Sequence, residues 1–430
     1  MKNLGLGLLI VAVGLALTVS PTNVFAKDAK GKITKDNWGE MVGFKPDASP
    51  EGFKPGKIID KRNVTKFRGL IPKGIALLVN KYNLRIWTKK YEPIHPSKGY
   101  IWATNKFLGK PELKDLGNST RKRGIKNYVA GLPFPKPKTG LEVAWNYQYA
   151  YNGDDGTFHY GVYWIDAKKG IERWEEWVWE FIIRTLNRTD LKPRPAYKNL
   201  KEKGIQYLSM TYAIQPYDKR GFGAVYKRYL KPKDQEGWVY MPNTKRAVQM
   251  KIGSTGEAWN STDMLYEDVR GYMGYPEWMN WELIEKKTLL MPMQAESPLG
   301  KEARDKVFDF KNPPHWNPKL KWEPRPVYVV EAKPKFSDYP YSRMVFYIDA
   351  ETYYIVLKES YDRKGKLWKV MINAFNASKN MEMYPPGVAA SLTIDVQAEH
   401  ATAFPSYNFK ANVGLKPSKF TKESILKKGK

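Results

Sequence analysis

The chain has 430 residues and carries 72 Lys and Arg against 44 Asp and Glu, which gives a formal net charge of +28. Hydrophobic residues make up 42% and charged residues 27% of it, which excludes a disordered chain, a collagen and a membrane protein with many spans. The sequence has no Cys, and this excludes disulfides, zinc–thiolate sites and a cysteine nucleophile.

The first 26 residues have the pattern of an export signal. Lys2 supplies the positive start, and the apolar stretch Leu4–Val19 is short and Gly-interrupted for a membrane span. Val24 and Ala26 are the small residues expected before a cleavage site. We therefore expect residues 1–26 to be a signal peptide, cleaved after Ala26, and the mature chain to be periplasmic. The alternative is an uncleaved membrane anchor.

Positive charge is concentrated in two stretches. Residues 54–126 hold 19 Lys or Arg and 4 Asp or Glu, and the tail from Leu415 holds six Lys and one Glu. In an exported chain this charge predicts contact with anionic lipid headgroups, lipopolysaccharide phosphates or another acidic envelope polymer, and no nucleic-acid partner. A solvated surface that resists aggregation explains the same charge.

The predicted elements begin with an extended N-terminal arm over residues 27–75, which are rich in Gly, Pro and Lys. β-branched and aromatic residues then predict strands over 76–88, 141–151 and 158–166. The letters NGDDGT at 152–157 predict a tight turn between the last two strands.

Segment 172–186 fits two secondary structures. A helix would place Trp174, Trp177 and Phe181 on one face, whereas a strand would place Trp177, Trp179 and Phe181 on one face. The strand is favoured because aromatic and β-branched residues have high strand propensity.

The remainder of the chain predicts strands over 222–230, 237–242, 245–250, 281–292, 343–349, 352–362, 367–375 and 391–404. The three strands over 343–374 predict an antiparallel meander. The strands 237–242 and 245–250 predict a short hairpin. The Pro-rich stretches 192–196 and 292–326 predict a linker or a long loop. Because no break in composition divides the chain, we expect one large antiparallel β domain over 76–414, followed by a basic tail over 415–430.

The sequence contains few signs of catalytic chemistry. The four His residues lack metal-ligand spacing: His95, His159, His315 and His400. Nucleophile elbows, phosphate-binding loops and dinucleotide-binding Gly patterns are absent from the sequence. We therefore predict no metal, no cofactor and no enzymatic activity.

Aromatic residues are abundant in the central strands, which include eight Trp: Trp164, Trp174, Trp177, Trp179, Trp238, Trp259, Trp278 and Trp281. They fit either a large packed core or the lining of an apolar cavity inside a curved sheet. Burial statistics favour the core, while the size of the sheet favours a cavity.

At NYVAGLPFPKP (127–137) the chain resembles the bacterial exported family known as domain of unknown function 1329. Further stretches agree with that family in the same order, at 144–147, 237–250, 267–292 and 347–370. Lys245 and Arg246 stand where a basic pair is usual. The meander is also similar to the lipoprotein-localisation carrier (LolA/LolB) superfamily, whose members are curved antiparallel half-barrels with a few covering helices and a cavity for acyl chains. The strong basic charge departs from the family pattern.

The resemblance implies a mainly β half-barrel that carries a lipid-like or other hydrophobic molecule in the periplasm. It also implies envelope lipid transport with an inner-membrane exporter of the resistance-nodulation-division type. The residues expected to line the cavity are Trp177, Trp179, Phe181, Trp238 and Tyr240, with Lys245 and Arg246 as a basic rim. The residues expected at the cavity edge, which simple packing explains equally well, are Leu132, Pro133, Phe134 and Pro135.

Two other functions remain open. An envelope structural or interaction protein would bind anionic polymer or lipopolysaccharide through residues 54–126. A secreted hydrolase would need a pair of carboxylates as acid and base, and the sequence spacing identifies no such pair.

Overall fold

The computed structural model describes residues 31–114, 124–231, 235–252, 256–295, 303–376 and 388–428. Residues 33–430 form one compact unit, to which the following description applies, and residues 1–32 form a second. Within the described residues, the helices are all too short or too polar to cross a bilayer.

The strands are β1 (Ile58–Ile59), β2 (Ile86–Thr88), β3 (Glu112–Leu113), β4 (Ile125–Lys126), β5 (Gly156–Asp166), β6 (Gly170–Ile182), β7 (Ile205–Gln215), β8 (Gly223–Tyr229), β9 (Gln235–Met241), β10 (Arg246–Ile252), β11 (Met279–Met291), β12 (Phe308–Asp309), β13 (Asn317–Pro318), β14 (Lys321–Pro334), β15 (Arg343–Asp349), β16 (Ile355–Tyr361), β17 (Leu367–Phe375), β18 (Val388–Asp395) and β19 (His400–Ala411). The α-helices are α1 (Trp38–Val42), α2 (Lys73–Tyr82), α3 (Lys98–Phe107), α4 (Gly140–Gln148), α5 (Lys198–Glu202), α6 (Ala303–Val307) and α7 (Lys422–Lys428). The 3₁₀ turns are η2 (Val64–Phe67), η3 (Tyr217–Lys219), η4 (Pro242–Thr244), η5 (Trp259–Ser261), η6 (Tyr266–Asp268), η7 (Pro276–Trp278) and η8 (Pro417–Lys419).

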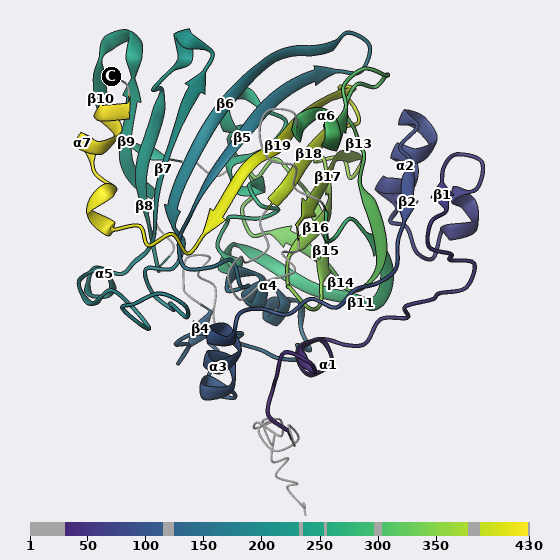
Figure 1. Cartoon of the computed structure of the whole chain (residues 1–430), viewed down its shortest axis with the longest axis horizontal. Coiled ribbons are helices and arrows are strands. Elements are labelled where there is room, and N and C mark those ends of the chain that lie inside the picture. Colours follow the sequence, from purple (N-terminus) through teal and green to yellow (C-terminus); the bar gives the residue numbers. More distant parts are fainter. Residues whose placement is uncertain are drawn as a thin grey trace, which may run out of the picture. The chain divides into compact units, whose positions relative to one another are not determined.

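Fifteen of these strands form one sheet in the order β1-β2-β14-β15-β16-β17-β18-β19-β5-β6-β7-β8-β9-β10, with β11 paired to β14. Its pairs are antiparallel except β2 with β14, which are parallel. Among the described strands β10 pairs only with β9, so the sheet ends there and is open. Figure 1 shows a curved sheet with α7 beside β8, β9 and β10. The predicted mainly β fold, with one large curved sheet and few helices, is confirmed.

Several predicted strands are present as expected. Segment 172–186 begins with strand β6, so the strand was the correct alternative. The meander over 343–374 corresponds to β15, β16 and β17, whose pairing is antiparallel. Its second turn is closed by Asp362, whose carboxylate accepts the backbone N–H groups of Lys364 and Lys366, each at 2.9 Å.

The prediction of a strand over 141–151 is wrong, because this segment contains helix α4. Thr139 Oγ1 accepts the backbone N–H of Glu142 at 3.2 Å, and the Glu142 carboxylate accepts the N–H of Thr139 at 3.0 Å. This capping box satisfies two donors at the start of the helix. Residues 152–155 therefore lie between a helix and β5, which begins at Gly156, and residues 152–157 do not form a hairpin turn.

Two further predictions need correction. Most of segment 76–88 belongs to helix α2, which buries Ile75, Leu78, Val79 and Tyr82 along one face. The predicted strand over 391–404 is in fact two antiparallel strands, β18 and β19, which turn between Asp395 and His400.

The main hydrophobic core includes side chains from the described part of the predicted arm. Trp38 is buried there, and its indole N–H donates to the backbone oxygen of Glu351 at 2.8 Å. Val42, Ile59 and Ile71 also pack in this core. Residues 33–75 are therefore continuous with the compact unit that contains the sheet.

Candidate ligand-binding face

Aromatic side chains cover one face of β5, β6 and β7, which we call the aromatic face. The register places Phe158 opposite Trp179 and Tyr160 opposite Trp177, with Phe181 two residues further along β6. Side chains alternate along a strand, so these five residues point to the same side. The buried members of this cluster are Phe158, Tyr160, Val162, Trp164, Trp177, Phe181, Tyr207, Ala213, Met264, Met371 and Phe404.

Part of this face is accessible to solvent. The half-buried members packed against the cluster are Trp179, Ile183, Phe222, Tyr226, Trp259, Val269, Met273, Val388 and Phe409. Large aromatic surfaces at intermediate exposure are typical of sites that contact apolar ligands.

The indole N–H groups on the aromatic face already have partners within the protein. Trp177 Nε1 donates to Glu175 Oε2 at 2.9 Å, and Trp179 Nε1 donates to Ser209 Oγ at 2.8 Å. An apolar molecule that covers these rings therefore leaves neither indole donor unsatisfied, which removes a main cost of apolar burial.

Residues 256–273, which we call the covering segment, lie over the aromatic face. Trp259 packs against Trp177 with ring centroids 5.9 Å apart and against Phe404 with centroids 5.8 Å apart. Met264 and Met273 add flexible apolar contacts to the same cluster.

One side of the covering segment is tied to the sheet through Asp263. Its carboxylate lies 2.8 Å from His400 Nδ1 and accepts the hydroxyl of Thr402 at 2.6 Å. The Asp263 hydrogen bond raises the pKa of His400 above its usual value, although burial of the ring opposes the charge. Lys369 Nζ donates to the backbone oxygen of Asp263 at 2.5 Å, so three strand residues hold this end.

The other side of the covering segment is tied through Glu267 and Asp268. Asp268 forms a buried ion pair with Lys358 and accepts the hydroxyl of Tyr341 at 2.7 Å. Burial raises the pKa of Glu267 to about 7, and the neighbouring Asp268 adds to this effect. The Glu267 carboxyl also accepts the backbone N–H of Gly256 at 3.1 Å.

The structure separates the five aromatic residues that the sequence grouped as a cavity lining. Trp177, Trp179 and Phe181 lie together on the aromatic face. Trp238 and Tyr240 lie on the opposite face of the sheet, in a cluster with Met210, Tyr212, Val225 and Ile425 of α7. The five residues therefore line two different surfaces.

The predicted basic rim is at the turn between β9 and β10. Lys245 and Arg246 are both exposed, and Lys245 has the left-handed φ of 52° that closes this turn. Arg246 pairs with Met241 in the register, which places it on the same side of the sheet as the aromatic face but at its outer edge.

The predicted edge loop, Leu132–Pro135, is held by helices α3 and α4. The backbone N–H of Leu132 donates to Thr104 Oγ1 at 2.9 Å. The side chain of Asn146 accepts the N–H of Phe134 at 2.9 Å and donates to its oxygen at 2.7 Å. Leu132 and Pro133 are buried, and Phe134 and Pro135 are half-buried.

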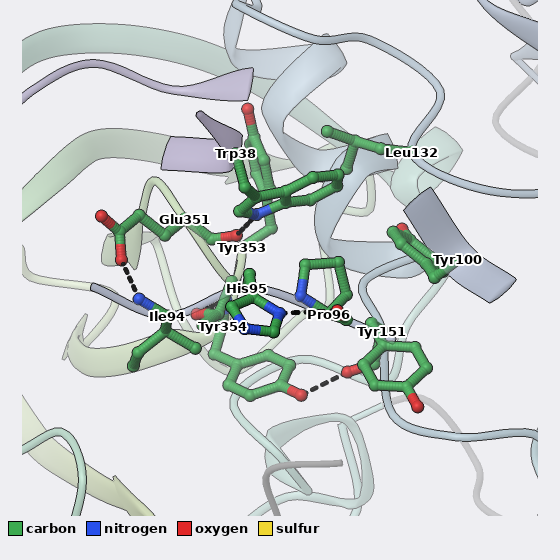
Figure 2. Close-up of a pocket in the computed structure, with 11 residues that line it drawn as sticks. Trp38, Ile94, His95, Pro96, Tyr100, Leu132, Tyr151, Glu351, Tyr353 and Tyr354 are labelled. Atoms are coloured by element: carbon green, nitrogen blue, oxygen red, sulfur yellow. Dashed lines mark hydrogen bonds between the residues drawn. The ribbon is translucent and has the colours of Figure 1, made fainter. Parts of the chain in front are cut away.

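Leu132 lines a small pocket that also includes Trp38, His95, Tyr151 and Glu351 (Figure 2). The cavity volume is about 20 Å³, which suits a single water molecule and is far too small for an acyl chain. The edge loop is therefore next to this small pocket and not in the aromatic cluster.

A buried charge cluster adjoins this pocket. Arg325 forms ion pairs with Asp349 at 2.7 Å, Glu351 at 2.6 Å and Glu323 at 3.1 Å. Burial opposes the charge of Arg325, but the three carboxylates outweigh it and raise its pKa further. The cluster joins β14 to the β15–β16 turn and leaves Arg325 without exposed surface, which fits a structural role.

Sequence reasoning missed the covering segment. Its ties join residues far apart in the chain, such as Asp263 with His400 and Asp268 with Lys358, and no local motif marks such pairs. Among the described residues, no cluster of three or more His, Asp or Glu side chains has a geometry able to hold a metal ion.

The sequence profile of the family described as protein of unknown function (DUF1329) matches residues 58–425. The uncharacterized protein PA3922 of Pseudomonas aeruginosa is 24% identical over 267 residues, which cover 57% of this chain and 53% of that protein. The chain thus matches about half the length of this curated relative.

Solved structures with some similarity include a domain assigned to outer membrane lipoprotein sorting from Vibrio parahaemolyticus, at 16% identity and a TM-score of 0.46 over 67% of this chain and 98% of that one. A DUF1329 family protein from Desulfovibrio piger has 15% identity and a TM-score of 0.45, covering 66% of this chain and 97% of that one. The LolA superfamily protein NE2245 from Nitrosomonas europaea has 13% identity and a TM-score of 0.38, covering 67% and 99%.

Proposed function

This chain belongs to the DUF1329 family, and from that premise we propose that it is a periplasmic carrier that binds a lipid-like or other hydrophobic molecule on its aromatic face. The observation that supports this proposal is a contiguous aromatic surface, half-exposed at Trp179, Phe222 and Phe409, whose indole donors are satisfied internally. Apolar burial would hold the ligand at about 0.8 kcal/mol per buried CH₂.

The proposed mechanism is passive binding and release. Met264 and Met273 can change rotamer to admit ligands of different shape, as Met residues do at adaptable binding surfaces. Arg246, on the same side of the sheet, would attract an anionic headgroup. We propose no catalytic step, because Glu175, the carboxylate within this face, is occupied by Trp177 and Asn260.

The location and partners complete the proposal. The signal-like residues 1–26 would direct export to the periplasm, with cleavage after Ala26. Cargo would be exchanged with an inner-membrane exporter of the resistance-nodulation-division type. A carrier of this kind needs access to both a membrane and an aqueous compartment.

The experiment is gentle purification from the native host, followed by solvent extraction and mass spectrometry. We expect a stoichiometric apolar compound. Titration with a fluorescent fatty acid then tests the site, with Trp179→Ala expected to weaken binding about tenfold through lost apolar contact. Trp238→Ala is the matched control, since Trp238 is a half-buried indole on the opposite face. Equal loss in both variants, or repeated absence of ligand, would contradict the proposal.

A further inference from the structure

Helix α3 carries an exposed Trp surrounded by lysines, which is rare on a surface with no partner. Trp102 is 57% exposed, the largest exposure of any described Trp. Lys98, Trp102 and Lys106 recur every four residues and therefore share one face of the helix. Lys106 Nζ lies 4.5 Å from the centre of the Trp102 ring, so its ammonium is over the indole face.

Further exposed apolar and basic residues follow the end of α3 in the chain. Leu108 and Leu113 are 37% and 36% exposed. In the sequence, the exposed Lys110 lies between these two leucines and the exposed Lys114 follows Leu113. Lys110 Nζ also lies 5.4 Å from the centre of the Phe107 ring. We call Trp102, Leu108 and Leu113, with Lys98, Lys106, Lys110 and Lys114, the α3 patch.

Residues 98–114, which carry the α3 patch, contain little negative charge. Helix α3 contains no Asp or Glu, and the one acid in residues 98–114 is Glu112. Glu112 is paired with Lys126 at 3.0 Å, and the carboxylate of Asp190 at the start of α3 accepts the hydroxyl of Ser97 at 2.6 Å. The patch is therefore both apolar and cationic.

A rigid base holds the patch in place. The opposite face of α3 buries Tyr100, Ile101, Ala103 and Thr104. Tyr100 donates its hydroxyl to the backbone oxygen of Tyr149 at 2.6 Å, and Ser97 caps the helix by accepting the N–H of Tyr100 at 3.1 Å. The helix can thus press its outer face against a surface without unfolding.

We propose that the α3 patch docks the protein reversibly on an anionic membrane surface, with Trp102 and the two leucines in the headgroup region and the lysines at lipid phosphates. Trp is enriched at membrane interfaces, and Lys can bury its stem while its ammonium stays at the polar boundary. Lys is depleted from protein–protein interfaces, so a patch that combines four lysines with one Trp fits a lipid surface better than a protein partner. This surface is separate from the aromatic face and goes beyond ligand carriage.

The test is co-sedimentation of the chain lacking residues 1–26 with vesicles of phosphatidylcholine alone or with about one-third phosphatidylglycerol. We expect binding only to the anionic vesicles, weakening as salt increases. Trp102→Ala should lower the partition coefficient about tenfold, and Lys106→Gln with Lys110→Gln about fivefold for each lysine removed.

Matched variants separate a local patch from diffuse charge. Trp174→Ala removes a Trp that is 39% exposed on β6, and Lys364→Gln with Lys366→Gln removes two exposed lysines from the β16–β17 turn. These variants should bind as the unmodified chain does, with unchanged circular dichroism for all. Equal losses in the control variants, or retention of Trp102→Ala on anionic vesicles, would overturn the proposal in favour of nonspecific attraction. Binding of soluble polyphosphate that depends on Trp102 as strongly as vesicle binding would overturn it in favour of an acidic polymer.

Discussion

Replacing Glu267 with Gln should remove a pH dependence of stability that this carboxyl causes. Burial raises the pKa of Glu267 from 4.5 to about 7, so the folded chain holds a proton that the unfolded chain has lost between these two values. The folded state is therefore favoured below about pH 4.5, and this contribution is lost as the pH rises towards about 7.

The expected magnitude follows from the two pKa values. Each pKa unit corresponds to about 1.4 kcal/mol, and the folded and unfolded values differ by about 2.5, so the penalty above pH 7 is about 3 kcal/mol. The amide introduced by Glu267→Gln would stay neutral and keep an oxygen for the backbone N–H of Gly256. Glu267→Gln should thus match the unmodified chain near pH 4.5 and exceed its stability by about 3 kcal/mol near pH 8.

The assay is urea unfolding of both proteins, followed by tryptophan fluorescence at several pH values between about 4.5 and 8. The control is Glu202→Gln, which changes an exposed carboxyl on α5 and should leave the pH profile unaltered. A difference between Glu267→Gln and the unmodified chain that stays constant across this range would refute the argument. So would a difference that grows towards acid.

Other substitutions test a close backbone contact at helix α3 and the buried charge cluster of Arg325. Gly131→Ala should destabilise the chain by about 2–4 kcal/mol in thermal unfolding, because φ is 84° and the added Cβ would lie 2.4 Å from the backbone nitrogen of Thr104. Gly365→Ala, at φ 77° with open space around it, should cost about 1–2 kcal/mol, and an equal cost at both positions would show that close approach is unimportant. Arg325→Met should cost about 3–5 kcal/mol by urea unfolding, since it removes the buried cation that Asp349 and Glu351 share, while Glu323 keeps its ion pair with Lys89 at 3.1 Å. Arg343→Met, which breaks a partly exposed ion pair with Glu331, should cost less than about 1 kcal/mol; a similar loss in both variants would contradict the structural role of the buried cluster.

The sequence was sufficient for strands whose pattern is local. The meander over 343–374 combines alternating residues with short polar turns, and the hairpin over 237–250 turns through exposed residues from Asn243 to Lys245. Both predictions depend on neighbours in the chain, and the structure confirms both.

The two missed helices carried signals that aromatic content obscured. Thr139 and Glu142 have capping-box spacing at the start of α4, and Pro72 and Asn83 flank α2 in positions typical of helix ends. The β-branched and aromatic residues of both segments have high strand propensity, and on that ground the sequence favours strands there despite these helix-end signals. Tertiary packing of an apolar helical face overrode that propensity.

The candidate site was predicted only in part, because it depends on which strand faces meet. Alternation within β6 correctly placed Trp177, Trp179 and Phe181 together. The assignment of Trp238 and Tyr240 to the same lining required the register across β7 and β8, which no local pattern specifies.

The distribution of contacts on the covering segment bears on how a carrier could release its ligand. Its polar ties include Asp263 with β19 and Asp268 with Lys358 of β16. Asn260 and Ser261 add hydrogen bonds to Glu175 and Trp164 of the sheet. The side chains of Trp259 and Met264 contact the aromatic face through apolar surface. A ligand that displaces these two side chains, while the backbone of the segment stays in place, exchanges one set of apolar contacts for another and leaves the hydrogen bonds of Asn260 and Ser261 intact. The net binding free energy is then the difference between two similar burial terms, so it stays small enough for transfer to a partner site.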